Sequence, residues 1–212
     1  MWELVKAGGW LMLPLVLCSI FTVAITIERF IRLKKSMILP KVLLLNSAQN
    51  TDAVMQQLQQ DQALQASTLG RIFMAGYQSK NQNQQFARAQ METTASQEIG
   101  YLEKNINFLG TLSAVAPLLG LLGTVLGIIE SFLVIDLGTN SNPTLMIPGI
   151  SKALITTAAG MFIAIPALFA YRYFQRLVQE YIAELEQQST LFHAALFYQN
   201  STDEEQDIRK AG

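Results

Sequence analysis

Four polar side chains in or beside the most apolar parts of the sequence are candidates for chemistry: Thr124, Glu130, Lys152 and Thr157. A carboxylate and an ammonium at the edge of an apolar segment can form an ion pair, and hydroxyls can donate and accept hydrogen bonds. Each threonine taken alone is more typical of a structural role, because the hydroxyl of a threonine in a membrane helix commonly donates a hydrogen bond to the carbonyl oxygen four residues earlier. The role of these side chains therefore depends on the elements that carry them.

The composition indicates a membrane protein. The 212 residues are 50% hydrophobic and 15% charged, against about 25% charged in an average soluble domain. The net charge of −1 excludes a basic surface for nucleic acid, so lipid is the expected surrounding partner. One cysteine, Cys18, and one histidine, His193, exclude an internal disulfide and a His/Cys metal cluster. No metal, cofactor or enzymatic nucleophile–base pair is expected.

Three uncharged segments are long enough to cross a bilayer as helices, which takes about 20 residues. They are residues 9–27, 106–129 and 153–171, and the first is expected to be an uncleaved span because its main basic cluster follows the apolar run. The fold class is therefore all-α, an integral membrane protein with three transmembrane helices. The expected spans, with their boundary residues, are 9–28, 106–135 and 148–172.

The cations set the orientation of the spans. Thirteen of the 15 lie on the side of the membrane that the chain occupies between spans 1 and 2 and again after span 3. Only Lys6, before span 1, and Lys152, between spans 2 and 3, fall on the other side. Cations near span ends mark the cytoplasmic side. The sequence thus predicts a periplasmic N-terminus, 1–8, a cytoplasmic helical domain, 29–105, a short periplasmic loop, 136–147, a cytoplasmic C-terminal helix, 173–199, and a flexible tail, 200–212.

Helical signals continue outside the spans. Thr51 is a predicted N-cap for a helix to about Asp61, and Ser67 or Thr68 for a second. Apolar positions then recur in steps of three and four without interruption into the second span, which predicts one helix of about 50 residues; these positions are Met91, Ala95, Ile99, Leu102, Ile106 and Leu109. The same period after the third span predicts a long C-terminal helix that packs against the other long helix or a neighbouring subunit.

Small residues and prolines mark the two later spans. Gly120, Gly123 and Gly127 form a face that permits close helix–helix approach, and Gly160 is its counterpart on the third span. We expect these glycines to serve packing. The prolines, Pro117 and Pro166, are expected to kink their helices or to be covered by neighbours.

Depth arithmetic relates the two charges. Glu130 lies six residues, about 9 Å, beyond Thr124, and Lys152 lies five residues, about 7.5 Å, before Thr157 on a helix that returns in the opposite direction. If the threonines share a level, the charges nearly share one, which predicts a Glu130–Lys152 ion pair near the outer end of the membrane. The alternative is that both side chains extend separately to the interface.

Three segments resemble one family of membrane proteins. The runs Ala114–Phe132 (AVAPLLGLLGTVLGIIESF) and Pro148–Tyr171 (PGISKALITTAAGMFIAIPALFAY) resemble the signature spans of the ExbB/TolQ/MotA proton-channel family, and Thr26–Phe30 (TIERF) resembles its first-span ending. The likeness is greatest to its ExbB and TolQ branches. It implies a homopentameric bundle around the transmembrane helices of an ExbD-like or TolR-like partner, which carries the proton-binding aspartate, and a TonB-like or TolA-like protein that receives the motion.

The resemblance also assigns residues. The family's pore threonines correspond to Thr124 and Thr157, which would form two hydroxyl rings at one level in a pentamer. Several relatives carry a glutamate where this chain has Lys152, and some carry a neutral polar residue where it has Glu130, so that glutamate's role does not transfer to Lys152. The leading expectation is an ExbB-like stator that energises TonB-dependent transport. The alternatives are a TolQ-like subunit of the Tol-Pal envelope-integrity system and a non-conducting scaffold.

Overall fold

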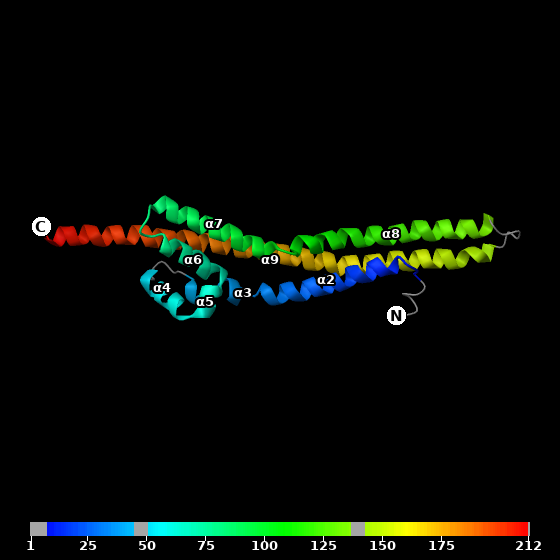
Figure 1. Ribbon diagram of the computed structural model, residues 1–212, viewed down its shortest axis with the longest axis horizontal. Helices are drawn as coiled ribbons and strands as arrows, with labels where there is room; N and C mark the ends of the chain where they lie inside the picture. The colour runs from blue at the N-terminus through cyan, green and yellow to red at the C-terminus, as the bar shows by residue number, and fades with distance from the viewer. Residues whose placement is uncertain (1–7, 45–50, 137–142, 212) are drawn as a thin grey trace. The chain divides into compact units, whose positions relative to one another are not determined.

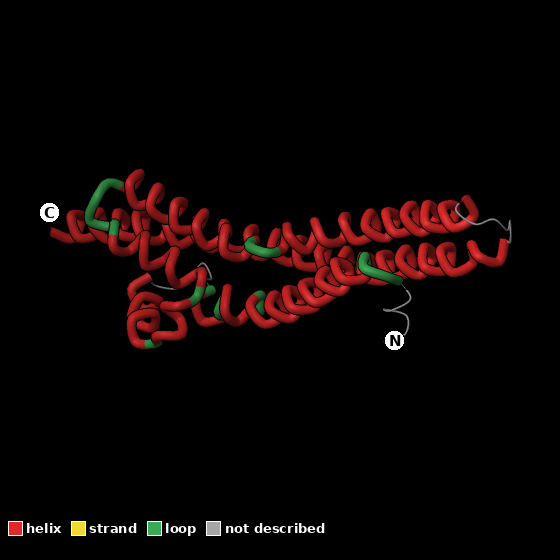
Figure 2. The backbone as a smooth tube through the Cα atoms, turned by 45° about the vertical axis from the view of Figure 1, so that its right-hand side comes forward, coloured by secondary structure: helices red, strands yellow, loops and turns green. Residues whose placement is uncertain are grey.

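The computed structural model describes residues 8–44, 51–136 and 143–211 (Figure 1). Throughout these ranges the regular elements are helices, and no strand is present among them (Figure 2). The all-α fold class is therefore confirmed, whereas the pentamer stays a prediction. In chain order the elements are α2 Met12–Arg32, α3 Lys35–Ile38, η1 Lys41–Leu43, α4 Thr51–Gln60, α5 Gln62–Ala66, α6 Thr68–Gln78, α7 Gln84–Glu103, α8 Ile106–Asp136, η2 Pro143–Met146 and α9 Ile147–Ala211.

Three helical segments are long and apolar enough to cross a membrane, as the sequence predicted. They are α2, the apolar part of Gln84–Leu133, and the apolar part of Thr144–Phe197. Most side chains of these segments are not buried within the single chain, which is the pattern of helices solvated by lipid or by other helices. The expected terminus 1–8 and loop 136–147 lie partly outside the described residues, so their boundaries and the sidedness of the spans stay predictions.

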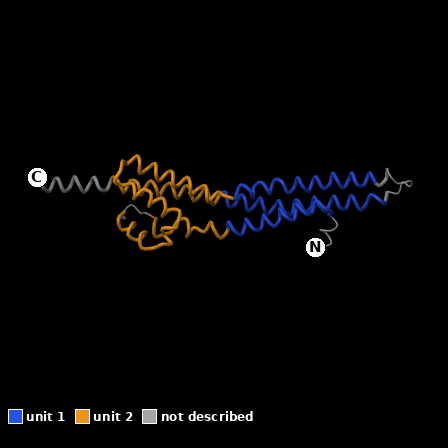
Figure 3. The backbone as a smooth tube through the Cα atoms, in the orientation of Figure 1, with its two compact units in different colours: residues 1–29, 105–175 blue, residues 30–104, 176–212 orange. Residues whose placement is uncertain are grey.

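The chain divides into two compact units, each built from two stretches of sequence (Figure 3). Unit 1 comprises residues 1–29 and 105–175 and contains most of α2, all of α8 and the first part of α9. In it α8 and α9 lie side by side (Figure 1). Its apolar centre joins α2, α8 and α9 through Met12, Leu15, Ala116 and Ala164. Unit 1 therefore holds all the site residues that the sequence singled out.

Unit 2 comprises residues 30–104 and 176–212. Its core is aromatic: the rings of Phe73 on α6 and Phe192 on α9 stack at 4.1 Å and 7°. The Tyr181 hydroxyl donates a hydrogen bond to the Leu33 carbonyl oxygen at 3.0 Å, which fixes α9 to the segment that follows α2. A buried carboxylate, Glu98 on α7, pairs with Arg71 on α6 at 2.8 Å.

The predicted helix of about 50 residues is interrupted. Helix α7 ends at Glu103 and α8 begins at Ile106, and between them Asn105 has a φ of 64°. Asparagine tolerates this left-handed conformation better than most residues, so the helical path breaks here although the apolar period continues across it. The Asn105 amide also donates to the Glu28 carboxylate at 3.1 Å, which ties the break to the end of α2.

Two further helix ends bear on the sequence predictions. Ser67 is the N-cap of α6, since its hydroxyl oxygen accepts a hydrogen bond from the Gly70 amide at 3.1 Å. Helix α4 begins at Thr51, and α9 continues to Ala211. The segment from 200 onward, expected as a flexible tail, is thus helical almost to its end.

Candidate functional site

Helices α8 and α9 approach each other through small residues. A β-carbon added to Gly123 would collide with the Thr156 hydroxyl, and one on Gly127 would lie 2.7 Å from the Gly149 carbonyl oxygen. A β-carbon on Gly160 would lie 2.6 Å from the Ala116 carbonyl oxygen. Larger side chains therefore do not fit at these contacts. This is the geometry that the packing interpretation of the glycines requires.

The two prolines sit inside intact helices. Pro117 is half-buried within α8, and Pro166 is exposed within α9. A proline has no amide N–H, so it cannot donate to the carbonyl oxygen four residues earlier. The carbonyl groups of Ser113 and Phe162 therefore lack their usual helical donors.

The two threonines make different hydrogen bonds. The Thr157 hydroxyl crosses between helices and donates to the Gly120 carbonyl oxygen at 2.9 Å. The Thr124 hydroxyl donates within its own helix to the Leu121 carbonyl oxygen at 2.6 Å. Each oxygen retains lone pairs that can accept a further hydrogen bond.

The two hydroxyls lie at similar levels along α8. The Thr157 hydroxyl donates to the Gly120 carbonyl oxygen and the Thr124 hydroxyl to that of Leu121, the next residue of the same helix. Neighbouring residues of a helix differ by about 1.5 Å along its axis. The single chain is therefore compatible with two hydroxyls at one level, and the two rings in a pentamer stay a prediction.

The structure brings Glu130 and Lys152 together. The Lys152 ammonium donates to the two carboxylate oxygens of Glu130 at 2.8 and 3.0 Å. The lysine side chain is 29% exposed and the glutamate side chain 51% exposed, so the pair lies at a surface of the single chain.

The segment before α2 covers the lysine of this pair. Gly9 has a φ of 72°, and a β-carbon placed there would collide with the Lys152 side chain. Gly8, Trp10 and Leu11 line a hollow of about 10 Å³ beside the pair, which is close to the smallest space that can hold one water molecule. Glycine at position 9 thus satisfies both an unusual backbone angle and a close approach.

A further side chain ties the same end of α8 to the segment before α9. The Ser131 hydroxyl, 2% exposed, donates to the Gly127 carbonyl oxygen at 2.8 Å and lies 3.2 Å from that of Met146. Neither Ser131 nor Gly9 stood out in the sequence as a site residue. The only available signal was their position: a small polar residue next to Glu130, and a glycine pair at the start of a span.

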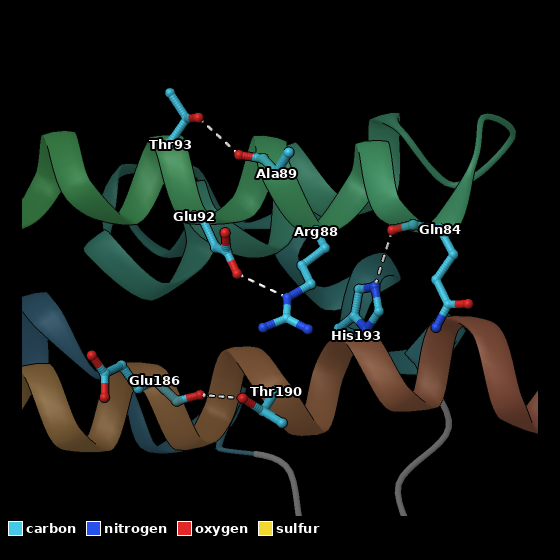
Figure 4. Close-up of polar contacts among 8 residues, drawn as sticks. All are labelled: Gln84, Arg88, Ala89, Glu92, Thr93, Glu186, Thr190 and His193. Carbon is cyan, nitrogen blue, oxygen red and sulfur yellow. Dashed lines mark hydrogen bonds and ion pairs between the residues drawn. The ribbon is translucent and has the colours of Figure 1, made fainter.

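Unit 2 contains a larger cleft, of about 490 Å³, between α7 and α9 (Figure 4). Buried Met91 and Leu185 are apolar parts of its lining. On the α7 side Arg88 donates to Glu92 at 2.8 Å, and on the α9 side the His193 ring lies 3.3 Å from the Gln84 carbonyl oxygen (Figure 4). His193 is half-buried in this contact within its own unit.

Comparison with known proteins assigns the family. The pattern described as "MotA/TolQ/ExbB proton channel family" matches residues 64–187, more than half of the chain. This chain belongs to that family. The match includes α7, the glycine face of α8, the Glu130–Lys152 pair and the membrane part of α9, so the resemblance noted in the signature runs is confirmed. The family is described by ion transport rather than by an enzymatic reaction.

Individual relatives carry two kinds of name. Putative biopolymer transport protein ExbB-like 1 of Synechocystis is 30% identical over 91% of this chain and 78% of its own length. Tol-Pal system protein TolQ of Haemophilus influenzae is 36% identical over 50% of this chain and 49% of its own length. Biopolymer transport protein ExbB of Salmonella typhimurium is 40% identical over 40% of this chain and 35% of its own length. The chain thus matches less than half of the TolQ and ExbB proteins.

Proposed function

We propose that this chain is the inner-membrane stator subunit of a proton-driven motor. In this proposal five copies surround the transmembrane helices of an ExbD-like single-span protein, and the complex energises TonB-dependent transport across the outer membrane. The N-terminus is periplasmic and the C-terminus cytoplasmic, an orientation supported by the 13 cations assigned to one side. Family membership and the ExbB-like relatives support this assignment.

The observation that carries the proposal is that the apolar segments of α8 and α9 contain hydroxyl side chains but no carboxyl group. Residues 106–129 and 153–171 contain no charged side chain. A proton relay within the membrane needs titratable groups, so the proton-binding carboxyl must come from a partner. The hydroxyls of Thr124 and Thr157 each donate a hydrogen bond to a carbonyl oxygen and keep lone pairs that can accept one. A protonated carboxyl group of the partner can donate to these lone pairs.

The similar levels of the two hydroxyls allow one partner carboxyl to use both. A carboxyl that contacts the Thr157 hydroxyl can reach the level of the Thr124 hydroxyl with little travel along the membrane normal, because the two acceptor carbonyl groups differ by about 1.5 Å along α8. The proton-motive force supplies about 2.3 kcal/mol per charge per 100 mV for the transfer of a proton across the membrane. We propose that the output is rotation of the partner helices within the ring, transmitted to a TonB-like protein.

The Glu130–Lys152 pair is proposed to lock α8 to α9 at the outer end of the membrane. Its bidentate geometry supports this role, and its distance of about 9 Å from Thr124 keeps both charges away from the hydroxyls. A paired charge also avoids the cost of an isolated one in lipid, which is about 2.5–3.5 kcal/mol at the centre of a helix on insertion scales.

A TolQ-like role is the second candidate, favoured by the two TolQ relatives at 36% and 40% identity. In that role the partner is TolR-like, the recipient is TolA-like, and the output maintains the cell envelope. A non-conducting scaffold is the remaining alternative, in which the threonines serve only the helix contacts that they already make.

Purification from the native host in a gentle detergent distinguishes these roles. An affinity tag at the C-terminus should recover a single-span protein with one acidic residue in its span, and its identity as ExbD-like with TonB, or TolR-like with TolA, decides between the first two candidates. Recovery of the chain without any single-span partner contradicts both. A chain deletion that impairs uptake of outer-membrane substrates and leaves the envelope intact supports the ExbB-like role.

A further inference from the structure

The segment that follows α2, residues 33–44, has two unlike sides. One side packs into unit 2 through four apolar residues that are each at most 4% exposed: Leu33, Ile38, Leu39 and Leu43. The other side is exposed and carries both charged and apolar side chains, among them Lys34, Met37, Lys41 and Val42. Met37 is 60% exposed and Val42 is 52% exposed. We call these four exposed residues the outward surface.

The outward surface has a firm base on α9. The Tyr181 hydroxyl donates to the Leu33 carbonyl oxygen at 3.0 Å, and the Lys35 ammonium donates to the Glu184 carboxylate at 2.6 Å. Both acceptor–donor pairs join residues of unit 2. The segment is therefore held in place from its buried side, and its outward surface needs no rearrangement to meet a partner.

Two lysines of the outward surface carry charges that the chain does not neutralise. Lys35 is paired with Glu184, whereas neither Lys34 nor Lys41 has an ion-pair partner among the residues that the structure describes. Ammonium groups beside exposed apolar side chains are typical of surfaces that lie at the boundary between lipid headgroups and hydrocarbon.

The position of the segment along the chain agrees with that boundary. Helix α2 is long and apolar enough to cross a membrane, and it ends at Arg32. Four helical residues, about 6 Å, separate the expected end of the span at residue 28 from the end of α2. Because the headgroup layer on each side of the hydrocarbon is about 5–7 Å thick, the segment that begins at residue 33 starts at the level of the lipid headgroups.

We propose that the outward surface is a binding site for anionic phospholipids of the adjoining leaflet. The Lys34 and Lys41 ammonium groups contact lipid phosphate oxygens, and the Met37 and Val42 side chains lie against the apolar part of the same lipids. The site ties unit 2 to the membrane surface beside α2. This inference rests on the membrane-spanning character of α2 and is independent of proton conduction.

Solid-state NMR of the full chain in nanodiscs tests the contact. Nanodiscs of mixed phosphatidylcholine and phosphatidylglycerol are compared with nanodiscs of phosphatidylcholine alone, and proximity is measured between lysine side-chain nitrogen and lipid phosphorus. Lys34→Gln and Lys41→Gln assign the two signals. Lys80→Gln is the matched control, because it removes the same charge from an exposed lysine of unit 2 whose ammonium lies 4.1 Å from the centre of the Tyr77 ring.

Both Lys34 and Lys41 should show phosphorus contact in the mixed nanodiscs, and Lys80 should show none. In detergent, native mass spectrometry should find that Lys34→Gln and Lys41→Gln each lower the affinity for phosphatidylglycerol about fivefold, while Lys80→Gln leaves it unchanged. Absence of phosphorus contact at either Lys34 or Lys41 overturns the proposal. An equal loss of affinity in Lys80→Gln overturns it as well, and so does equal contact in phosphatidylcholine alone.

Discussion

The Lys152 ammonium is bound to both carboxylate oxygens of Glu130, at 2.8 and 3.0 Å, across the contact between α8 and α9. Both residues border long uncharged segments, and in the structure the two opposite charges neutralise each other. The pair is partly exposed, which limits its energy in a single chain. Its value to the protein therefore depends on the membrane around it.

A double-mutant cycle measures this pair. Glu130→Lys and Lys152→Glu alone should each lower the thermal stability of the purified protein, because each places two like charges together. The exchanged double variant should recover most of the loss, with a coupling free energy of about 1 kcal/mol. If the double variant is no more stable than the worse single variant, the two residues do not act as a pair.

Gly160→Ala tests the close approach of α8 and α9. The added methyl group meets backbone on both sides, 2.6 Å from the Ala116 carbonyl oxygen and 3.1 Å from the Gly120 Cα, and backbone cannot move aside cheaply. We expect a loss of about 1–3 kcal/mol in the free energy of unfolding. Gly100→Ala is the control, since nothing lies within 4 Å of its added carbon, and it should leave stability unchanged or raise it. Equal effects of the two substitutions would contradict the packing argument.

The buried carboxylate of unit 2 predicts unequal costs for two similar ion pairs. The Glu98 side chain, which pairs with Arg71, is 11% exposed, and Glu98→Ala should lower the free energy of unfolding by about 1–3 kcal/mol. The Glu92 side chain, which pairs with Arg88, is 65% exposed, and Glu92→Ala should lower it by less than about 0.5 kcal/mol. Urea unfolding of the two variants checks this difference. A Glu98→Ala variant as stable as Glu92→Ala would show that the α6–α7 contact does not depend on this carboxylate.

The Lys35–Glu184 pair predicts an alkaline dependence of stability. The hydrogen bond to Glu184 holds the pKa of Lys35 above its usual value, which is about 10.4. A raised pKa in the folded state contributes stability that is complete below the unfolded pKa and is lost as the pH rises through the folded one. Melting temperatures of the wild type and Glu184→Gln should therefore differ slightly at pH 8 and converge as the pH rises through the raised pKa of Lys35. A difference that grows with alkaline pH contradicts this assignment.

The sequence predicted the parts of the fold that depend on hydropathy and missed those that depend on single backbone angles. Three uncharged runs located the apolar helices, and Ser67 was correctly offered as an N-cap. The break at Lys104 and Asn105 could not be foreseen, because the apolar period passes through it and only a ψ of 139° at Lys104 and a φ of 64° at Asn105 interrupt the helix. The extension of α9 to Ala211 was missed because its last residues are polar and resemble a solvated tail.

The site shows the same division. The Glu130–Lys152 contact followed from chain direction and depth alone. The premise of level threonines is compatible with the structure, since their hydroxyls donate to the carbonyl oxygens of neighbouring residues. The cover of Lys152 by Gly9 depends on a φ of 72° at that one residue, which no periodicity encodes.

Proton flux through the reconstituted complex tests the central claim most directly. The chain and its co-purified single-span partner are placed in liposomes with an imposed membrane potential, and internal pH is recorded for Thr124→Val, Thr157→Val, Thr157→Ser and Thr111→Val. We predict that the first two assemble but lose about 100-fold or more in flux, the range ascribed to positioned proton-transfer groups. Thr157→Ser should conduct as the wild type does, and so should Thr111→Val, a change at an exposed threonine of α8 whose hydroxyl donates to the Asn107 carbonyl oxygen. Wild-type flux in both valine variants would contradict a proton pathway through Thr124 and Thr157.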